Sequence, residues 1–208
     1  TTMTQAPLQM SPLPSGEWKE ISADFYGPLQ TGEYLLVMVD DYSRFPEIEV
    51  VRSTSTNAVI RRIDSIFARH GVPEVLKTDN GPSFNGELFS RWLKSIGCEH
   101  RKITPLWPQA NGEVERLMKS IGKVIRTAKV DKTSWNQALF TFLRHYRATP
   151  HCTTGKSPAE LLFGRTIRTE IPSVLASHSN SANHREEVAE KDLAQKMNMR
   201  VRADEKRK

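Results

Sequence analysis

The sequence predicts one α/β domain in which helices flank a five-stranded mixed sheet. Two observations support this fold class. Three strand-like segments, joined only by short turns, follow one another between residues 18 and 52. Beyond them, the spacing of apolar residues changes to a helical period, and helices alternate with two further strand-like segments. This order is typical of a mixed sheet whose first three strands are antiparallel.

The first three strands are expected at residues 18–25, 34–40 and 46–52. The second reads YLLVMVD, a continuous apolar run that is typical of a strand covered on both faces. The third reads PEIEVVR, which alternates and is rich in β-branched residues. Because only short turns join the three strands, we expect an antiparallel meander.

The rest of the domain is predicted from helical periodicity and its punctuation. Two strands are expected at 74–78 and 99–103, and helices at 56–69, 87–96, 113–130 and 134–147. In the first helix, Thr54 or Thr56 is the expected N-terminal cap, and Gly71 is expected to end it. A last short helix is expected to begin with Ser157 as cap, Pro158 in the first position and Glu160 in the third.

Composition divides the chain into three parts. Residues 1–16 are polar and rich in proline, which predicts a linker, and residues 17–172 form the predicted folded core. Residues 173–208 are Ser-rich and then charged, which predicts a polar tail that is partly helical and leads to a further module.

Charge and cysteine content limit the function classes. The net charge of +6 favours a polyanionic partner, nucleic acid first. The two cysteines, Cys98 and Cys152, form no CxxC pair, so a zinc ribbon or finger is not expected. No apolar run approaches the length of a membrane span, and no secretion signal is expected at the N-terminus.

Three acidic residues stand at the ends of predicted elements. Asp24 lies near the end of the first strand, Asp79 follows the fourth strand, and Glu115 lies in the first turn of the long helix. Carboxylates from such positions can meet at one edge of a sheet, where they repel one another unless a cation neutralises them. Oxygen ligands suit a hard ion such as Mg²⁺, and two such ions can hold both oxygens of an in-line phosphoryl displacement.

The segments around these residues resemble the catalytic core of retroviral and long-terminal-repeat retrotransposon integrases. The matching segments are DFYGP at residues 24–28, TDNGPSF at 78–84 and PQANGEVER at 108–116. Thirty-five residues, 80 to 114, separate Asp79 from Glu115, which is the D,D-35-E spacing of that family. SPAELLFGR at 157–165 resembles the segment that closes the core in gypsy-type elements. The resemblance covers roughly residues 10–172.

The resemblance implies an RNase H-like fold and insertion of retroelement DNA into target DNA by 3′-end processing and strand transfer. Asp24, Asp79 and Glu115 would be the catalytic carboxylates, with two Mg²⁺ or Mn²⁺ ions as cofactors. DNA would be the partner, the protein a dimer or higher homo-oligomer, and its location the nucleus. The zinc module that precedes this core in the family is not seen in the sequence.

Glu113 is a competing candidate only two residues from Glu115. At 100° per residue the two side chains point about 200° apart, whereas Glu115 shares a face with a basic stripe. That stripe, Lys119, Lys123 and Arg126, is expected to hold DNA phosphates, although solvated basic residues are the ordinary interpretation. Gln109, Asn111 and Arg116 are weaker candidates for contact with DNA.

Other residues are expected to have structural roles. Asp40 and Asp41 end the second strand, where they more often cap a turn than bind metal. Trp18, Trp92 and Trp135 are expected in the core, and Trp107 near DNA. Two alternatives to an integrase remain open: an RNase H-type nuclease, and a domesticated core that binds DNA or assembles without catalysis.

Overall fold

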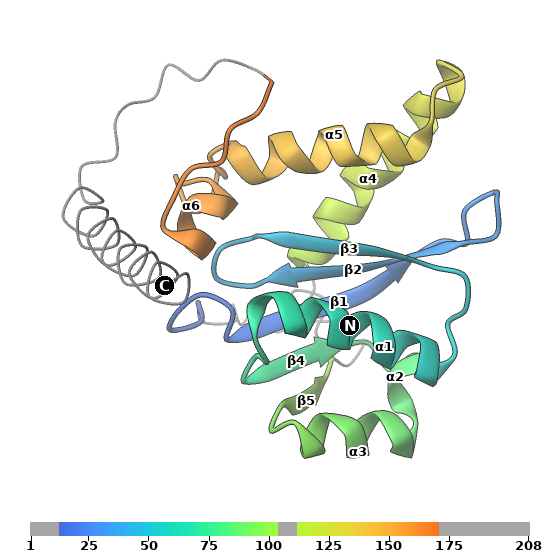
Figure 1. Ribbon diagram of the computed structural model, residues 1–208, viewed down its shortest axis with the longest axis vertical. Helices are drawn as coiled ribbons and strands as arrows, with labels where there is room; N and C mark the ends of the chain where they lie inside the picture. Colours follow the sequence, from blue (N-terminus) through green and yellow to red (C-terminus); the bar gives the residue numbers. More distant parts are fainter. Residues whose placement is uncertain (1–12, 104–111, 171–208) are drawn as a thin grey trace, which may run out of the picture. The chain divides into compact units, whose positions relative to one another are not determined.

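The computed structural model describes residues 13–103 and 112–170, which belong to one compact unit that ends at Glu170. Its centre is a single five-stranded sheet in the order β3-β2-β1-β4-β5 (Figure 1). The strands are β1 (Glu20–Tyr26), β2 (Tyr34–Asp40), β3 (Pro46–Val51), β4 (Val75–Thr78) and β5 (Glu99–Lys102). The first three form the expected antiparallel meander, whereas β4 and β5 run parallel to β1. The mixed α/β fold is confirmed.

Helices cover both faces of the sheet. They are α1 (Thr56–His70), α2 (Pro82–Asn85), α3 (Glu87–Ser95), α4 (Gly112–Val130), α5 (Trp135–Ala148) and α6 (Pro158–Phe163). Buried side chains of α1, α2 and α3 pack with Ile21, Ala23 and Leu76 on one face. Buried side chains of α4 and α5 pack with Leu35, Val37 and Val39 on the other face. The strand β2, covered on both faces, is almost entirely buried, as its apolar sequence predicts.

The helix boundaries follow the expected signals with two exceptions. Ser157 accepts a hydrogen bond from the Glu160 backbone N–H at 3.2 Å, so the predicted cap of α6 is confirmed. The predicted threonine cap of α1 is wrong: Ser55 occupies that position, and its side chain makes no capping bond. The short helix α2 was not predicted, because Asn80-Gly81-Pro82 reads as a turn and four residues carry no periodic signal.

Several side chains expected in structural roles lie where predicted. Trp18 is buried, and Trp92 and Trp135 pack partly buried against the two cores. Asp40 caps the β2–β3 turn by accepting hydrogen bonds from Ser43 N at 3.0 Å and Ser43 Oγ at 2.6 Å. Among residues 13–103 and 112–170, no helix has the length and apolarity needed to cross a membrane.

Candidate metal centre and nucleic-acid groove

Asp24 and Asp79 are brought together by the parallel pairing of β1 with β4. Ala23 lies opposite Thr78 in that ladder, so the next residue along each strand is Asp24 and Asp79. Alternate strand residues point to opposite faces, and Ala23 faces the core built on α1 and α3. Asp24 therefore faces the other side, toward α4, as does its antiparallel neighbour Val37. Both carboxylates stand at the carboxyl end of parallel strands.

Glu115 approaches the same place from the first turn of α4. It is solvent-exposed, while its neighbours Val114 and Leu117 are buried and fix the rotation of the helix. Burial raises the pKa of Asp24, the backbone N–H of Phe25 opposes that shift over 2.7 Å, and the charges of Asp79 and Glu115 raise the pKa further. Three carboxylates from three separate elements thus lie within electrostatic reach of one another.

The turn after β4 fixes the Asp79 side chain. Gly81 N donates to Asp79 Oδ1 at 3.0 Å, and Asn85 Nδ2 donates to Asn80 O at 2.7 Å. Below the turn, Phe84 is buried and stacks on Phe25, with ring centroids 5.1 Å apart. Phe25 directly follows Asp24, and Phe84 lies in the helix that follows Asp79. Their stacking therefore holds the segments that carry Asp24 and Asp79 next to each other. This role of Phe84 was missed from sequence because it depends on the unpredicted helix.

The donor set suits a hard divalent cation. Asp24, Asp79 and Glu115 offer only carboxylate oxygens, the ligands that Mg²⁺ and Mn²⁺ prefer. In the part of the chain that the structure describes, no group of three or more His, Cys, Asp or Glu side chains lies close enough to hold a metal ion. Coordination of one ion by all three carboxylates would therefore require them to draw closer than they lie here.

Glu113 points away from these carboxylates. Its Oε1 lies 3.4 Å from Arg116 Nη1, and its Oε2 lies 4.0 Å from His151 Nε2 in the segment between α5 and α6. Its charge also contributes to raising the pKa of Tyr146, after burial, to about 12. Glu113 thus lies among Arg116, His151 and Tyr146, and the choice of Glu115 as the metal ligand stays a prediction. Arg116 lies on the Glu113 side.

A groove lies beside Glu115, with a volume of about 1080 Å³. One wall is the exposed face of α4, and the other is the end of β1 with the loop that follows it, residues 25–31. Of the predicted basic stripe, Lys119 and Arg126 line the groove and Lys123 does not. Lys129 and Lys132 also line the groove, although neither was predicted from the sequence. Lys129, three residues after Arg126 in α4, continues the helical spacing of the stripe and could have been found from it. Lys132 lies in the turn after α4, where no helical period applies.

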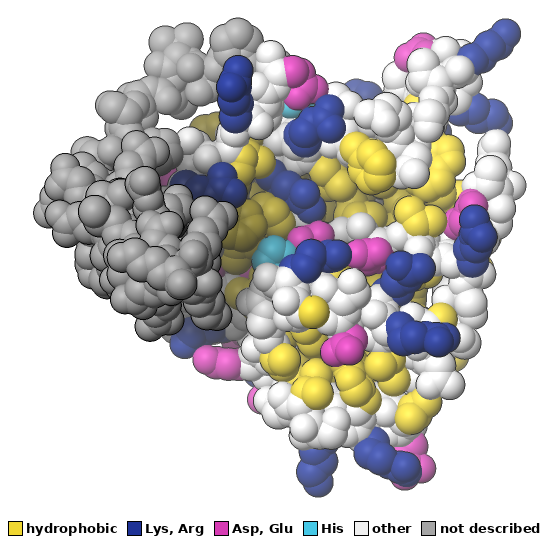
Figure 2. All heavy atoms as spheres, viewed as in Figure 1, with side chains coloured by type: hydrophobic (Ala, Val, Ile, Leu, Met, Phe, Trp, Pro, Cys, Tyr) yellow, Lys and Arg dark blue, Asp and Glu magenta, His cyan; other side chains and the backbone are white. Residues whose placement is uncertain are grey.

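Basic residues also lie on the surface away from this groove (Figure 2). Figure 2 shows Lys and Arg side chains spread over the visible face of the described residues, with acidic side chains among them. The net charge therefore does not by itself locate a nucleic-acid surface, and the four basic residues that line one groove with Glu115 are the candidates for contact with DNA. Gln109, Asn111 and Trp107, the other candidates for contact with DNA, lie outside the described residues.

Asp41 and Lys77 form a second polar cluster on the α4 face of the sheet, below the carboxylates. Lys77 Nζ lies 2.9 Å from Asp41 Oδ2 and also pairs with Glu20. Ser22 Oγ donates to Asp41 Oδ1 at 2.8 Å. Lys77 is buried, and its pKa is nevertheless raised, because the charges and hydrogen bonds of Asp41 and Glu20 outweigh the effect of burial. The carboxylates of Asp41 and Glu20 are therefore paired with the ammonium group of Lys77.

Comparison with known proteins connects this geometry to a family. Residues 19–108 match the family model described as "Integrase core domain". The chain is 39% identical over 166 residues to "Uncharacterized protein K02A2.6" of Caenorhabditis elegans, covering 79% of this chain and 13% of that protein. It is 30% identical over 153 residues to the Pol polyprotein of Radiation murine leukemia virus, covering 71% of this chain and 25% of that protein. The chain thus spans a quarter or less of the length of these relatives.

Solved structures share the fold. The HTLV-2 integrase catalytic core domain in complex with magnesium aligns with a TM-score of 0.60 at 18% identity, over 71% of this chain and 98% of that one. A chain of the simian T-cell lymphotropic virus intasome, solved with PP2A regulatory subunit B56 gamma, aligns with a TM-score of 0.64 at 19% identity, over 86% and 63% of the two chains.

The fold is therefore the RNase H-like fold of integrase catalytic cores. Within that class, residues 19–108 match the integrase core domain family, and the chain is similar in sequence to the Pol polyproteins of retroviruses.

Proposed function

We propose that this chain is the catalytic core of a retroelement integrase, which inserts element DNA into target DNA by metal-dependent polynucleotidyl transfer. The observation that carries the proposal is the approach of Asp24, Asp79 and Glu115 from β1, the turn after β4, and α4. In this proposal they hold two Mg²⁺ or Mn²⁺ ions. The magnesium complex of the HTLV-2 core domain supports this choice of ion.

The chemistry needs no covalent enzyme intermediate. When bound, the ions would lower the pKa of the attacking hydroxyl, polarise the phosphate and stabilise the leaving oxygen. In end processing, a water oxygen would attack a phosphodiester near the DNA 3′ end. The bond between phosphorus and the 3′-oxygen of the retained strand would break, so that the phosphate leaves on the 5′ end of the released fragment and the 3′-oxygen takes up a proton as a free hydroxyl. In strand transfer, the freed 3′-hydroxyl attacks a phosphodiester of the target, and the displaced 3′-oxygen leaves. Phosphoanhydride energy is not required, because one phosphodiester replaces another.

The chain's own residues position the substrate for these steps. The rigid centre of the sheet holds Asp24 and Asp79, and the buried face of α4 holds Glu115. Lys119, Arg126, Lys129 and Lys132 line the groove that leads away from Glu115, where they would contact phosphates of the DNA backbone. We further propose that the protein acts as a homo-oligomer in the nucleus; the HTLV-2 core domain has been solved in dimeric and trimeric forms.

The test is strand transfer on short DNA duplexes with Mg²⁺ or Mn²⁺, comparing this chain and an extended chain with their Asp79→Asn variants. The substitution removes one charge at an exposed position, so the fold should persist by circular dichroism while strand transfer is lost. Normal strand transfer by Asp79→Asn would contradict the proposal. Hydrolysis of RNA in hybrids without strand transfer would indicate an RNase H-type nuclease, and metal-independent DNA binding without either activity would indicate a non-catalytic module.

A further inference from the structure

Tyr26 and Gly122 lie on the same two elements as Asp24 and Glu115, β1 and α4, and on the same faces of these elements. Tyr26 follows Asp24 by two residues on β1, so both side chains project from the same face of the strand. Gly122 follows Glu115 by seven residues in α4, which returns it to within about 20° of the same helix face. Tyr26 and Gly122 therefore lie next to Asp24 and Glu115, between the same faces of β1 and α4.

The tyrosine fills the space left by the glycine. A Cβ built on Gly122 would lie 2.6 Å from Tyr26 Oη and 3.2 Å from Tyr26 Cζ, distances that leave no room for a side chain. The same point is 3.2 Å from Arg126 Nη1, so the guanidinium borders this contact on the groove side. The Tyr26 ring also packs against the apolar core between the sheet and α4. Its outer end thus rests on the backbone of the helix.

Local preference does not explain a glycine at this position. Gly122 is buried in the middle of α4, and the other glycine of this helix, Gly112, is its first residue. Glycine in a helix interior costs about 1 kcal/mol relative to alanine. The close approach of Tyr26 supplies a physical reason for it.

We propose that Tyr26 is a positioning residue that sets the separation of β1 and α4, and with it the separation of Asp24 and Glu115. The inference rests on the proposed function, in which these two carboxylates hold the same metal ions. A tyrosine ring packed along its length is a rigid connection between two elements. Because Mg²⁺ and Mn²⁺ require ligands at closely defined distances, a small change in this separation should affect metal affinity more than folding.

The experiment measures Mn²⁺ binding, from the loss of the free-ion paramagnetic resonance signal, in the full chain. Gly122→Ala adds the one methyl group that the contact excludes, and Thr127→Ala, on an exposed position of the same helix, is the matched control. Thr127→Ala should bind Mn²⁺ as the wild type does. Gly122→Ala should bind it about tenfold more weakly, with a thermal unfolding midpoint close to that of the wild type. Adding Tyr26→Phe to Gly122→Ala should recover part of the loss.

Two results would overturn the inference: Mn²⁺ affinity of Gly122→Ala within threefold of the wild type, or no recovery on adding Tyr26→Phe. If Gly122→Ala does not fold, Tyr26→Leu shortens the connection without adding an atom to the helix. It should then lose Mn²⁺ affinity by at least fivefold, and unchanged affinity would equally overturn the inference. Absence of Mn²⁺ binding by the wild type would contradict the proposed function instead, so the two failures are distinguishable.

Discussion

Gly81 donates its backbone N–H to Asp79 Oδ1 over 3.0 Å, and a Cβ at Gly81 would lie 3.0 Å from that same oxygen and 3.2 Å from Oδ2. The backbone of Gly81, with φ −62° and ψ 152°, is one that any residue can adopt. Glycine is therefore needed here for space beside a carboxylate rather than for its conformational freedom. This relationship makes the Asn80-Gly81 turn part of the candidate metal centre.

Gly81→Ala is expected to lower strand transfer about tenfold, because the added methyl group displaces the Asp79 carboxylate. The thermal unfolding midpoint should hardly change, since the backbone conformation remains allowed. Gly86→Ala is the matched control: its φ and ψ are similar, and its Cβ would meet only Thr56 Oγ1 at 3.6 Å. Equal strand-transfer rates for the two variants would show that the space beside Asp79 is unimportant.

Glu115→Gln should reduce strand transfer far more than Glu113→Gln, although the two residues are only two positions apart in α4. Loss of the Glu115 charge is expected to reduce strand transfer by at least 100-fold, as the removal of a proposed metal ligand should. Glu113 contacts Arg116 and His151 instead, so Glu113→Gln should retain activity within about threefold. Rates measured on one DNA duplex at saturating Mn²⁺ test the pair, and greater loss in Glu113→Gln would refute the assignment of Glu115.

Charge reversal in α4 and the turn that follows it should distinguish basic residues that line the groove from those that do not. Lys129→Glu and Lys132→Glu are expected to weaken DNA binding several-fold, and Lys123→Glu less, because Lys123 does not line the groove. Removing one interaction with a phosphate should also reduce the slope of log affinity against log salt by about 0.9 for duplex DNA. Binding isotherms at several salt concentrations provide both values. A larger effect of Lys123→Glu would place DNA outside the groove.

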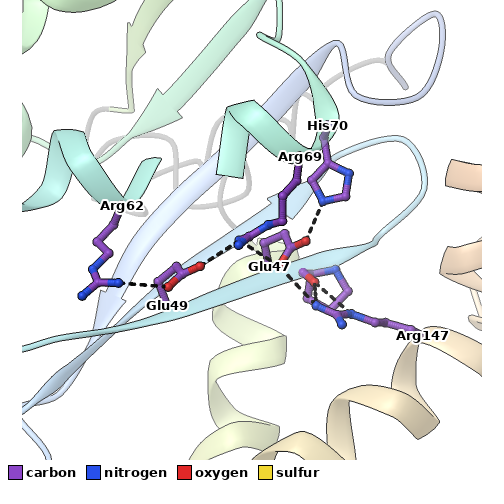
Figure 3. A network of polar contacts seen from close by, with 7 residues as sticks. Glu47, Glu49, Arg62, Arg69, His70 and Arg147 are labelled. Atoms are coloured by element: carbon purple, nitrogen blue, oxygen red, sulfur yellow. Dashed lines mark hydrogen bonds and ion pairs between the residues drawn. The ribbon is translucent and has the colours of Figure 1, made fainter. Parts of the chain in front are cut away.

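Glu47 should make the stability of the fold depend on acid pH. Burial opposes its ionisation, but the hydrogen bond from His70 at 2.5 Å and the charges of Arg147 and Arg69 outweigh burial and lower its pKa (Figure 3). A carboxyl whose pKa is lowered in the folded state stabilises that state above its unfolded value, near 4.5. This stability is lost as the pH falls below that value and passes through the folded pKa.

Glu47→Gln is therefore expected to unfold about 1–3 kcal/mol more easily at pH 7, mainly because Arg147 loses a buried partner. Arg69, whose Nη2 lies 3.6 Å from Glu47 Oε2, contributes less than Arg147, because its side chain is half-exposed and solvent screens its charge. As the pH falls below about 4.5, the unfolding midpoint of the variant should depend less on pH than that of the wild type. Urea unfolding across this range tests both points; parallel curves for the two proteins would refute the role of Glu47.

Local patterns predicted most of the fold. The apolar run of β2 and the helical spacing of Val59, Ile63, Ile66 and Phe67 depend on neighbours in sequence, and all these side chains are buried as expected. The cap of α1 and the existence of α2 were not predicted. In both, a few residues next to glycine, proline or threonine have several nearly equal conformations, and contacts made elsewhere in the fold select one.

Residue chemistry and spacing were enough to predict the five strands and most of the helices, their order, and three carboxylates at the ends of elements. The contacts between these groups depend on the packing of the whole domain. The register of Ala23 with Thr78 places Asp24 beside Asp79, the burial of Val114 and Leu117 turns Glu115 toward them, and Tyr26 rests on Gly122. Such contacts join residues that are tens of positions apart, and their geometry is set by packing that no local pattern records.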